Sequence, residues 1–424
     1  MRNKTIFSKY FVLLMINYTL LFINYTIINP ILPKYAISLG MSISLAGIIS
    51  GAFALTALVF RPVSGKLADK KNPKMLFIIS NVIMAAACVM YVLGNSFASL
   101  LIARIAHGVA FALISVVSIV ILLQFVPKNR IGQAIGLYGM GSIIAISFGP
   151  AIGLELGNAF GYHICFLLAG SLPLISIVVL LFIPYEYKRN EADTREKNLR
   201  NDEERLHGIG NVEGEAIAYE KTEKEGANQY KGIKKIIATE VLFYAILAGF
   251  FSFANGVEFT FIALYAQSKS IENISLYFTV SAIFILVSRL FAGKIYDTRG
   301  LAHVLIPAFI VASIGMNTLS FANYLWVFFI AAALKGLGQG AGQPSLQAQC
   351  INSVPAYRVG LASSTYFIGP DVMQGLGPIV GGYIIAYSNY ETIFFVCGGL
   401  LALGLIIYAI HLKNNKYTAS SGNV

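Results

Sequence analysis

Long apolar stretches alternate with short polar ones along most of the chain. Twelve of these stretches approach the roughly 20 residues that a helix needs to cross the hydrocarbon core of a bilayer. They lie near residues 11–33, 42–60, 75–94, 98–124, 134–157, 164–184, 237–260, 273–291, 303–321, 325–347, 359–387 and 390–411. The pattern predicts an all-α integral membrane protein with twelve transmembrane helices, six before residue 185 and six after residue 236.

One long polar segment separates these two groups of spans. Residues 185–235 hold eleven Lys and Arg and twelve Asp and Glu, so their charges nearly cancel. We interpret this segment as a solvated linker and not as a catalytic domain. The predicted organisation is an N-terminal six-helix bundle over 1–184, a cytoplasmic linker over 185–235, a C-terminal six-helix bundle over 236–412 and a cytoplasmic tail over 413–424.

The placement of basic residues predicts how the chain is oriented. An even number of spans puts both termini on one side, and Lys and Arg collect on the cytoplasmic side of membrane proteins. Of the 31 Lys and Arg, Lys34 and Lys269 lie on the opposite side, Arg104 and Lys335 lie within spans, and the others lie on the side of the termini. We therefore expect a multi-pass protein of the cell membrane with cytoplasmic termini and the lipid bilayer as its surroundings.

Composition supports a membrane protein and excludes several other classes. Hydrophobic residues make up 57% and charged residues 12% of the chain, and the mean hydropathy is +0.70. Soluble domains carry about 25% charged residues, so a soluble, disordered, collagen-like or disulfide-rich secreted chain is excluded. The orientation explains the formal net charge of +11, and we therefore expect no nucleic-acid partner.

The two groups of spans repeat each other at a constant offset of 228 residues. Arg61, Gly65, Lys66 and Asp69 recur as Arg289, Gly293, Lys294 and Asp297; Arg130, Gly132 and Ala134 recur as Arg358, Gly360 and Ala362; Gly149, Pro150 and Gly153 recur as Gly377, Pro378 and Gly381. The repeat predicts two pseudo-symmetric bundles that insert the same way up. Bundles related in this way enclose a site near mid-membrane, and rocking exposes that site to each side in turn.

Two segments carry a resemblance to a known family. The loop Gly65-Lys66-Leu67-Ala68-Asp69-Lys70-Lys71-Asn72-Pro73-Lys74 resembles the G-x-L-a-D-r-x-G-r-k signature of the major facilitator superfamily, with Asn72 at a usual glycine position. The fifth span, with Gly136, Ala145, Gly149, Pro150, Gly153 and Leu154, resembles the motif of the exporting, antiporter branch, with Ala and Leu at two glycine positions. The resemblance covers essentially the whole chain and implies the fold of that superfamily and the activity of its twelve-span drug/proton antiporters, which include multidrug efflux proteins.

The signature loop predicts a gate. Asp69 at a helix end can pair with Arg130 or with a neighbouring helix terminus and so latch one conformation. The predicted gating residues are Gly65, Asp69, Lys70, Arg130, Gly293, Asp297 and Arg299. The alternative is a solvated loop that only fixes the orientation.

The span-five segment predicts a hinge or a proton-tight seal. Gly149 and Gly153, four residues apart, permit close helix approach, and Pro150 removes a backbone hydrogen bond and kinks the span. Gly136 belongs to the same motif. Ordinary helix packing is the alternative.

Ionisable residues inside spans are the main functional signal, because each costs at least ~2.5–3.5 kcal/mol to insert. The proton-coupling and cavity candidates are Asp371, Lys335, Arg104, His107 and Glu258. Arg104 and His107 lie in a segment that resembles the family's R-x-x-q-G element. Arg104 keeps its proton, so it either tunes a proton site or holds an anionic group. His107 either titrates near neutral pH or packs as a hydrogen-bonded residue.

Lys335 and Asp371 lie at similar depth on consecutive spans, and we predict that they form an ion pair. Protonation of Asp371 would then release Lys335, and proton and substrate would compete for one carboxylate. A purely structural ion pair is the alternative. Gln339, Gln343 and Gln347 share one helical face because they are four residues apart, and they face either a polar cavity or neighbouring helices.

Together these patterns predict a secondary active transporter that exports a small drug-like or amphipathic molecule by proton antiport through alternating access. A proton-coupled importer, an exporter of an endogenous metabolite such as a sugar or metallophore, and a transport-like sensor are the alternatives. The chain has no G-x-x-x-x-G-K-[ST] motif and its five histidines are scattered, so we predict no enzyme, no cofactor and no bound metal. The expected partners are a small-molecule substrate and protons, and we expect a monomer.

Overall fold

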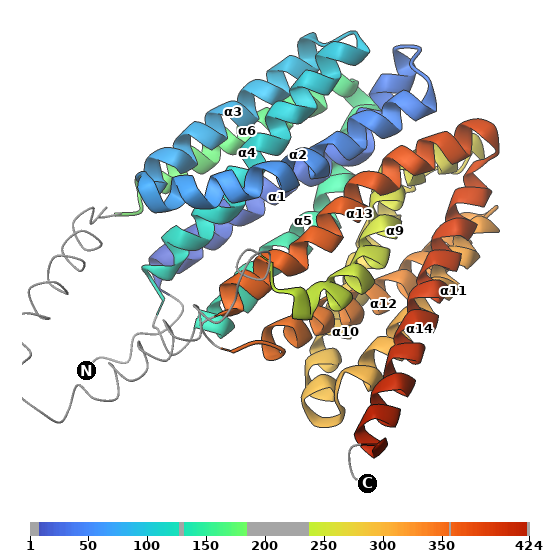
Figure 1. The fold of residues 1–424 in the computed structure, drawn as a ribbon. Coiled ribbons are helices and arrows are strands. Elements are labelled where there is room, and N and C mark those ends of the chain that lie inside the picture. Colours follow the sequence, from blue (N-terminus) through green and yellow to red (C-terminus); the bar gives the residue numbers. More distant parts are fainter. Residues whose placement is uncertain (1–7, 127–130, 185–236, 356–357, 422–424) are drawn as a thin grey trace, which may run out of the picture.

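The computed structural model describes residues 8–126, 131–184, 237–355 and 358–421. Within these ranges the chain forms twelve long helices, one short 3₁₀ turn, η3 (Thr239–Val241), and no strand. The first six helices are α1 (Lys9–Ser38), α2 (Ile43–Lys70), α3 (Pro73–Leu93), α4 (Phe97–Leu123), α5 (Ile131–Phe160) and α6 (Tyr162–Leu181). The second six are α9 (Leu242–Ser268), α10 (Ser275–Arg299), α11 (Leu301–Ser320), α12 (Leu325–Asn352), α13 (Val359–Tyr387) and α14 (Tyr390–Ser421). The predicted all-α fold with two six-helix bundles is confirmed (Figure 1).

Short turns between the helices bring consecutive spans back through the bundle. The Ser42 hydroxyl accepts a hydrogen bond from the Leu45 amide and starts α2, and Ser96 with Ser99 forms a capping box at the start of α4. Gly161 and Gly300 have φ of +84° and +81°. Glycine adopts this left-handed conformation without strain, so α5 and α10 each turn into the next helix at a single residue.

Eleven of the described helices are long and apolar enough to cross a membrane, and α13 is the exception. Its glycines, Pro370, Asp371 and Gln374 lower its hydropathy. α13 packs most extensively against α9 and α2, so neighbouring helices, and not lipid, cover much of its surface. Elsewhere, large apolar side chains such as Leu93 and Leu290 are exposed on the outside of the bundles, as lipid requires.

The two bundles meet along a few helices. Inside the N-terminal bundle α1 packs on α5 and α6, and α4 packs on α2 and α3; inside the C-terminal bundle α9 packs on α13, and α12 packs on α10 and α11. Across the boundary the main contacts are α2 with α13, α5 with α10 and α1 with α9 (Figure 1). The repeat offset relates α2 to α10 and α5 to α13, so the first two contacts are pseudo-symmetric copies of each other.

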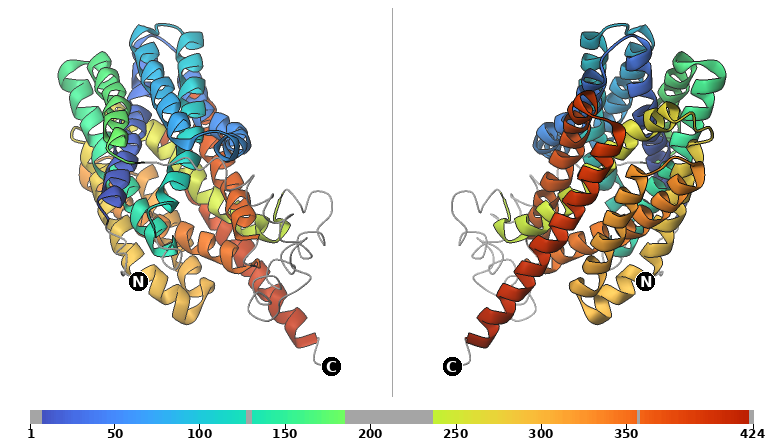
Figure 2. Two further views of the ribbon diagram at one scale, coloured as in Figure 1. Left: turned by 90° about the vertical axis from the view of Figure 1, so that its left-hand side faces the viewer. Right: turned by 90° about the vertical axis from the view of Figure 1, so that its right-hand side faces the viewer.

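The boundary is closed at one end of the molecule. We call the end at which α1 begins and α14 finishes the terminal end; α14 projects there beyond the other helices (Figure 2). Towards the opposite, far end, a Cβ atom on Gly47 or Gly51 of α2 would collide with the α13 backbone. The Ser275 hydroxyl of α10 donates to Glu155 Oε1 of α5 at 2.6 Å, and the Thr279 hydroxyl donates to the Ser147 carbonyl at 3.2 Å. Both pseudo-symmetric contacts therefore seal the far end.

The linker predicted over 185–235 lies outside the described residues, and so does Arg130. The last helix, α14, continues to Ser421, past the apolar run at 390–411. The apolar run predicts where the chain leaves the membrane, not where the helix ends. A helix can continue into water beyond the last apolar residue.

Candidate functional site

A cavity of about 550 Å³ lies between the bundles, from the middle of the helices towards the terminal end. Helices α1, α2, α4 and α5 line one side, and α9, α10, α12 and α13 line the other. Aromatic rings such as Phe22, Phe111 and Phe259 alternate with polar groups. The charged and amide side chains of its lining are Arg61, Asn255, Arg289, Gln339, Gln343, Gln347, Asp371 and Gln374. An apolar wall with a few converging polar groups is the usual build of a small-molecule site.

One ion pair joins the two bundles in the wall of this cavity. Arg61 of α2 places Nε 2.6 Å from Asp371 Oδ2 and donates from Nη2 to Oδ1 at 3.2 Å. Its guanidinium also lies over the Phe367 ring, 5.2 Å from the centroid. The pair thus combines one charge-assisted hydrogen bond, from Nη2 to Oδ1, with a short charge contact between Nε and Oδ2. The side chains are 27% and 15% exposed, so the pair can be reached from the cavity.

A second ion pair lies wholly inside the C-terminal bundle. Lys335 of α12 pairs with Glu258 of α9, and the two side chains are 3% and 1% exposed. Lys335 Nζ also donates to Asn255 Oδ1 at 2.9 Å. Neither Lys335 nor Glu258 lines the main cavity.

The predicted pairing of Lys335 with Asp371 is therefore wrong, since each residue pairs with another partner. Equal depth in the membrane does not bring two residues together when their helices face different neighbours. α12 packs mainly on α10 and α11, whereas α13 packs mainly on α9 and α2.

Arg104 of α4 is buried without a counter-charge. It is 1% exposed, Nη2 donates to Asn29 Oδ1 at 2.5 Å, and the guanidinium lies 4.6 Å from the centre of the Phe53 ring. Its Nε and Nη1 make no hydrogen bond. A narrow extension of about 10 Å³, roughly the room for one water, lies beside Arg104 and shares Tyr25, Phe53 and Gln374 with the lining of the main cavity.

His107 lies one helical turn from Arg104 and away from the cavity. Its Nδ1 is 3.3 Å from the Tyr91 hydroxyl, and its ring meets Phe53 edge-on at 5.1 Å. It is fully buried and is absent from the lining of both cavities. This environment favours the packing interpretation; a proton role for His107 stays a prediction.

Arg289 of α10 is a functional candidate that sequence reasoning passed over. It lines the cavity, is exposed, and takes part in none of the ion pairs among the described residues. In the sequence, Arg61 and Arg289 stand out only as repeat positions in basic segments. The repeat also contains the missing signal: Asp371, the partner of Arg61, corresponds to Ile143 in the other half.

The three glutamines of α12 face the cavity, and two of them, Gln339 and Gln343, also bond to a neighbouring helix. Gln339 Nε2 donates to Asn255 Oδ1 at 3.2 Å, and Gln343 Nε2 donates to the Ser252 hydroxyl at 2.8 Å. Asn255 Nδ2 in turn donates to Gln374 Oε1 at 3.3 Å, so an amide network links α9, α12 and α13.

The gating residues are only partly described. The side chains of Asp69 and Lys70 and all of Arg130 lie outside the described residues, so the latch between Asp69 and Arg130 stays a prediction. A Cβ atom on Gly65 or Gly293 would meet nothing within 4 Å.

The second copy of the gate is better defined. Asp297 and Arg299 are exposed at the end of α10. Arg358, the counterpart of Arg130, donates from Nη1 to Glu240 Oε1 at 2.8 Å. This bond ties the start of α13 to η3.

The span-five glycines pack α5 tightly against α1. A Cβ atom on Gly149 would collide with the Thr26 side chain, and one on Gly153 would press on the Ile27 backbone. The Thr26 hydroxyl donates to the Ala145 carbonyl at 2.9 Å. Helix packing thus accounts for two of the motif's positions, and the role of Pro150 as a hinge stays a prediction.

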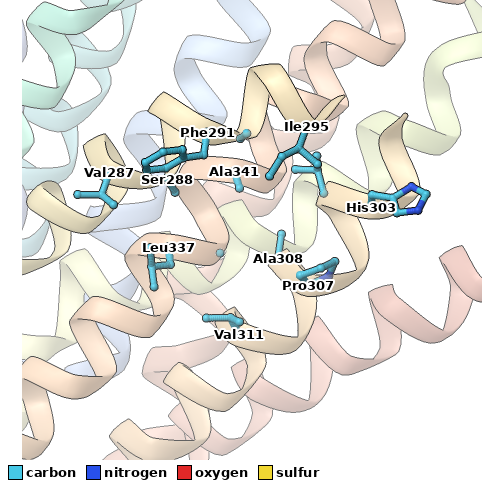
Figure 3. A pocket seen from close by; sticks show the side chains of 13 residues that line it. Val287, Ser288, Phe291, Ile295, His303, Pro307, Ala308, Val311, Leu337 and Ala341 are labelled. Carbon is cyan, nitrogen blue, oxygen red and sulfur yellow. The ribbon is translucent and has the colours of Figure 1, made fainter. Parts of the chain in front are cut away.

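A separate hollow of about 310 Å³ lies within the C-terminal bundle (Figure 3). Side chains of α10, α11 and α12 surround it, among them Val287, Phe291 and Leu337. Ser288 and His303 are its polar lining residues, and Phe291 is 61% exposed. All of its lining residues belong to the C-terminal bundle. It lacks the converging polar groups that the cavity between the bundles has.

Comparisons with known proteins agree with this architecture. The sequence model of the Major Facilitator Superfamily matches residues 14–300 and 267–422. The staphylopine export protein of Staphylococcus aureus strain Mu50 is 23% identical over 93% of this chain and 94% of its own length. The quinolone resistance protein NorA of the same species is 22% identical over 97% of both chains. The multidrug resistance protein MdtG of Enterobacter lignolyticus is 23% identical over 93% of this chain and 90% of its own.

Solved structures share the fold at lower sequence identity. A POT family transporter in complex with a thioalcohol-conjugated peptide superposes with a TM-score of 0.74 at 13% identity, over 95% of this chain and 96% of the other. A bacterial homolog of the human lysosomal transporter Spinster gives 0.69 at 16% identity, over 96% and 97%. The fold and the matched relatives are those of transporters.

Proposed function

Because the chain belongs to the major facilitator superfamily, we propose that this multi-span membrane transporter exports a small organic molecule in exchange for protons by alternating access. Three matched relatives carry names of export or drug resistance. A cavity of about 550 Å³ between two bundles, sealed at the far end, is the geometry that such a cycle needs in one of its states.

The orientation of the chain determines which side of the membrane the cavity faces in this state. With the termini in the cytoplasm, as the excess of Lys and Arg on their side supports, the cavity is on the cytoplasmic side and the sealed end faces outwards. Substrate then enters from the cytoplasm. A membrane-impermeant thiol label tests the orientation: a Lys413→Cys variant should react in inverted vesicles and not in intact cells, and the reverse result would contradict the proposal.

The observation that carries proton exchange is the pair between Arg61 and Asp371 across the bundle boundary. Asp371 is a carboxylate in the cavity wall, where a proton and a substrate can both reach it. Protonation removes its charge and leaves Arg61 without a partner, so the contact between α2 and α13 weakens. The two protonation states therefore favour different arrangements of the bundles, which is the coupling that antiport requires.

Glu258 is the other candidate coupling carboxylate of the C-terminal bundle, and we assign it a structural role in this state. It lies outside the cavity lining and is 1% exposed beside Lys335. A proton would have to enter a closed ion pair to reach it. Asp371 is thus the better coupling residue.

The experiment is transport into proteoliposomes under an imposed pH gradient, with a panel of dyes, antibiotics and chelators as cargo. For Asp371→Asn we expect the part of the transport that depends on the pH gradient to disappear. Exchange of cargo across the membrane without a gradient should persist. Glu391→Gln is the matched control, because Glu391 pairs with Lys269 in a partly exposed bridge outside the cavity lining. If Asp371→Asn exchanged cargo for protons at the wild-type rate, Asp371 would lose its role.

The endogenous-metabolite alternative keeps a specific support, since one relative is named for the export of staphylopine. A drug-like and an endogenous substrate would use the same cavity.

A further inference from the structure

The charges around the cavity do not balance. Arg61 and Asp371 cancel in its wall, and Lys335 and Glu258 cancel behind it. Among the described residues, the remaining charges at the cavity and its narrow extension are Arg289 and Arg104, and neither forms a salt bridge. The site in this state therefore carries two uncompensated positive charges.

The repeat shows that Arg289 lacks a partner because the acid is missing from its copy of the site. The offset of 228 residues carries Arg61 to Arg289 and carries Ile143 to Asp371. Ile143 and Arg289 both line the cavity, on α5 and α10, which form the pseudo-symmetric copy of the α2–α13 contact. One copy of the site thus holds a closed ion pair, and the other holds a free guanidinium.

Arg104 lines the small extension of about 10 Å³ beside the inner end of the cavity. Its surroundings are neutral: Asn29 takes one hydrogen bond and Phe53 stacks on the guanidinium. Nε and Nη1 remain without partners in a side chain that is 1% exposed. Burying a charge without a counter-charge is costly, and an anion that reaches the extension from the cavity would reduce that cost.

We propose that the substrate carries a carboxylate, bound by Arg289 in the cavity and by Arg104 at its inner end. Guanidinium groups match carboxylates in shape and charge and hold them through two parallel hydrogen bonds. The cavity volume of about 550 Å³ is within the range of small-molecule sites. Phe22 and Phe111 offer an aromatic wall for the rest of such a molecule.

Proton antiport requires one more chemical group on the substrate, and this part alone rests on the proposed function. A purely anionic substrate would bind together with a proton, because protonation of Asp371 makes the cavity more positive. Competition with the proton requires a cationic group on the substrate that interacts with the Asp371 carboxylate. The substrate class is then a zwitterion, with a carboxylate for the arginines and an amine for Asp371.

Binding to the purified protein in neutral detergent at one fixed pH tests the proposal. The probes are norfloxacin and N-benzylaspartate, which carry carboxylate and amine groups, their alkyl esters, and the permanent cation ethidium. We expect at least one acid to bind about tenfold more tightly than its ester, as lost hydrogen bonds to a charged group predict. If every ester, or ethidium, binds as tightly as the acids, or if neither acid shows saturable binding, the proposal is overturned.

Variants then assign the binding to the two arginines. Ile143→Asp should give Arg289 the acid that Arg61 already has and weaken the binding of the acid about tenfold, whereas Ile143→Asn, of the same shape without the charge, should leave it unchanged. Arg289→Gln should match Ile143→Asp. Equal affinities in all three variants would exclude Arg289.

Arg104 is tested by charge rescue. Arg104→Gln should lose affinity for the acid, and Arg104→Lys should retain part of it; equal losses in the two would contradict a role of its charge. If Arg104→Gln does not fold, the Ile143 and Arg289 variants still decide. No pH gradient is present in these measurements, so they stand even if Asp371→Asn leaves proton exchange intact.

Discussion

The two bundles share repeated motifs and the same helix order, yet they differ in how their buried cations are neutralised. Lys335 of the C-terminal bundle has a carboxylate beside it, whereas Arg104 of the N-terminal bundle has an amide and an aromatic ring. The two acids that neutralise cations at the site, Glu258 and Asp371, both belong to the C-terminal bundle. Their counterparts at the repeat offset are Pro30 and Ile143. Cations thus occur in both halves, but the neutralising carboxylates occur in one.

Because of this difference, proton exchange and binding of the substrate carboxylate fall to different residues. A proton needs a carboxylate in reach, so proton exchange belongs to the C-terminal bundle, at the boundary where Asp371 meets Arg61. A carboxylate on the substrate needs cations without partners, and Arg104 and Arg289 supply one from each bundle. Substrate bound by both would then connect the two bundles across the cavity.

The largest effect should come from opening the buried pair. Glu258→Gln leaves Lys335 buried without a counter-charge, and we expect a loss of about 3–5 kcal/mol in the free energy of unfolding. Adding Lys335→Met to it should recover most of this loss. Thermal unfolding in detergent measures both variants. A single variant as stable as the wild type would mean that Lys335 finds another partner or loses its proton.

These expectations depend on information that the sequence contains only in part. The apolar runs predicted the twelve helices, and the offset of 228 residues predicted two related bundles, because the runs recur along most of the chain and the offset recurs at three separate places. The buried charges were also found, since Arg104, Glu258, Lys335 and Asp371 interrupt apolar runs.

The pairing of those charges could not be predicted from depth alone. Lys335 and Asp371 lie at similar heights, but the direction in which each side chain points depends on which helices surround α12 and α13. Arg61 lies in a basic segment that the orientation already explained, so its place in the cavity was missed. The asymmetry between Asp371 and Ile143 at the repeat offset was a signal available in the sequence.

A smaller effect on the free energy of unfolding is expected at a glycine that recurs in the two bundles. Gly149 and its copy Gly377 both lie where helices touch, but a Cβ atom on Gly149 meets the Thr26 side chain, whereas one on Gly377 meets the Phe253 backbone carbonyl. The Thr26 hydroxyl can rotate away from the added atom and leave a contact of 2.9 Å with Thr26 Cβ, whereas the Phe253 carbonyl, at 2.5 Å, cannot move without shifting its helix. We expect Gly377→Ala to lower the free energy of unfolding by about 1–3 kcal/mol and Gly149→Ala by less.

Gly293→Ala is the matched control, because a Cβ atom there meets nothing within 4 Å. It should leave the free energy of unfolding within about 1 kcal/mol of the wild type or raise it slightly, since alanine favours a helix more than glycine does. Thermal unfolding of the three variants in one detergent gives the order. If Gly149→Ala were the most damaging, the packing of α5 on α1 would be less yielding than the contact of α13 with α9.

The smallest effect on stability should come from the cation without a counter-charge. Arg104→Met removes one hydrogen bond to Asn29 and the contact with Phe53, but it also removes the cost of burying an uncompensated charge. These contributions oppose each other, so the free energy of unfolding should change by less than about 1 kcal/mol. Lys335→Met, which leaves Glu258 alone, should instead lower the free energy of unfolding by several times as much.

Thermal unfolding compares the Arg104→Met and Lys335→Met variants, and binding of norfloxacin to Arg104→Met provides the second readout. A stable protein that no longer binds the acid is the expected result, because a buried charge that adds little to folding stability is best explained by a ligand that it binds. A large loss of stability in Arg104→Met would instead give Arg104 a structural role and leave Arg289 as the anion-binding residue.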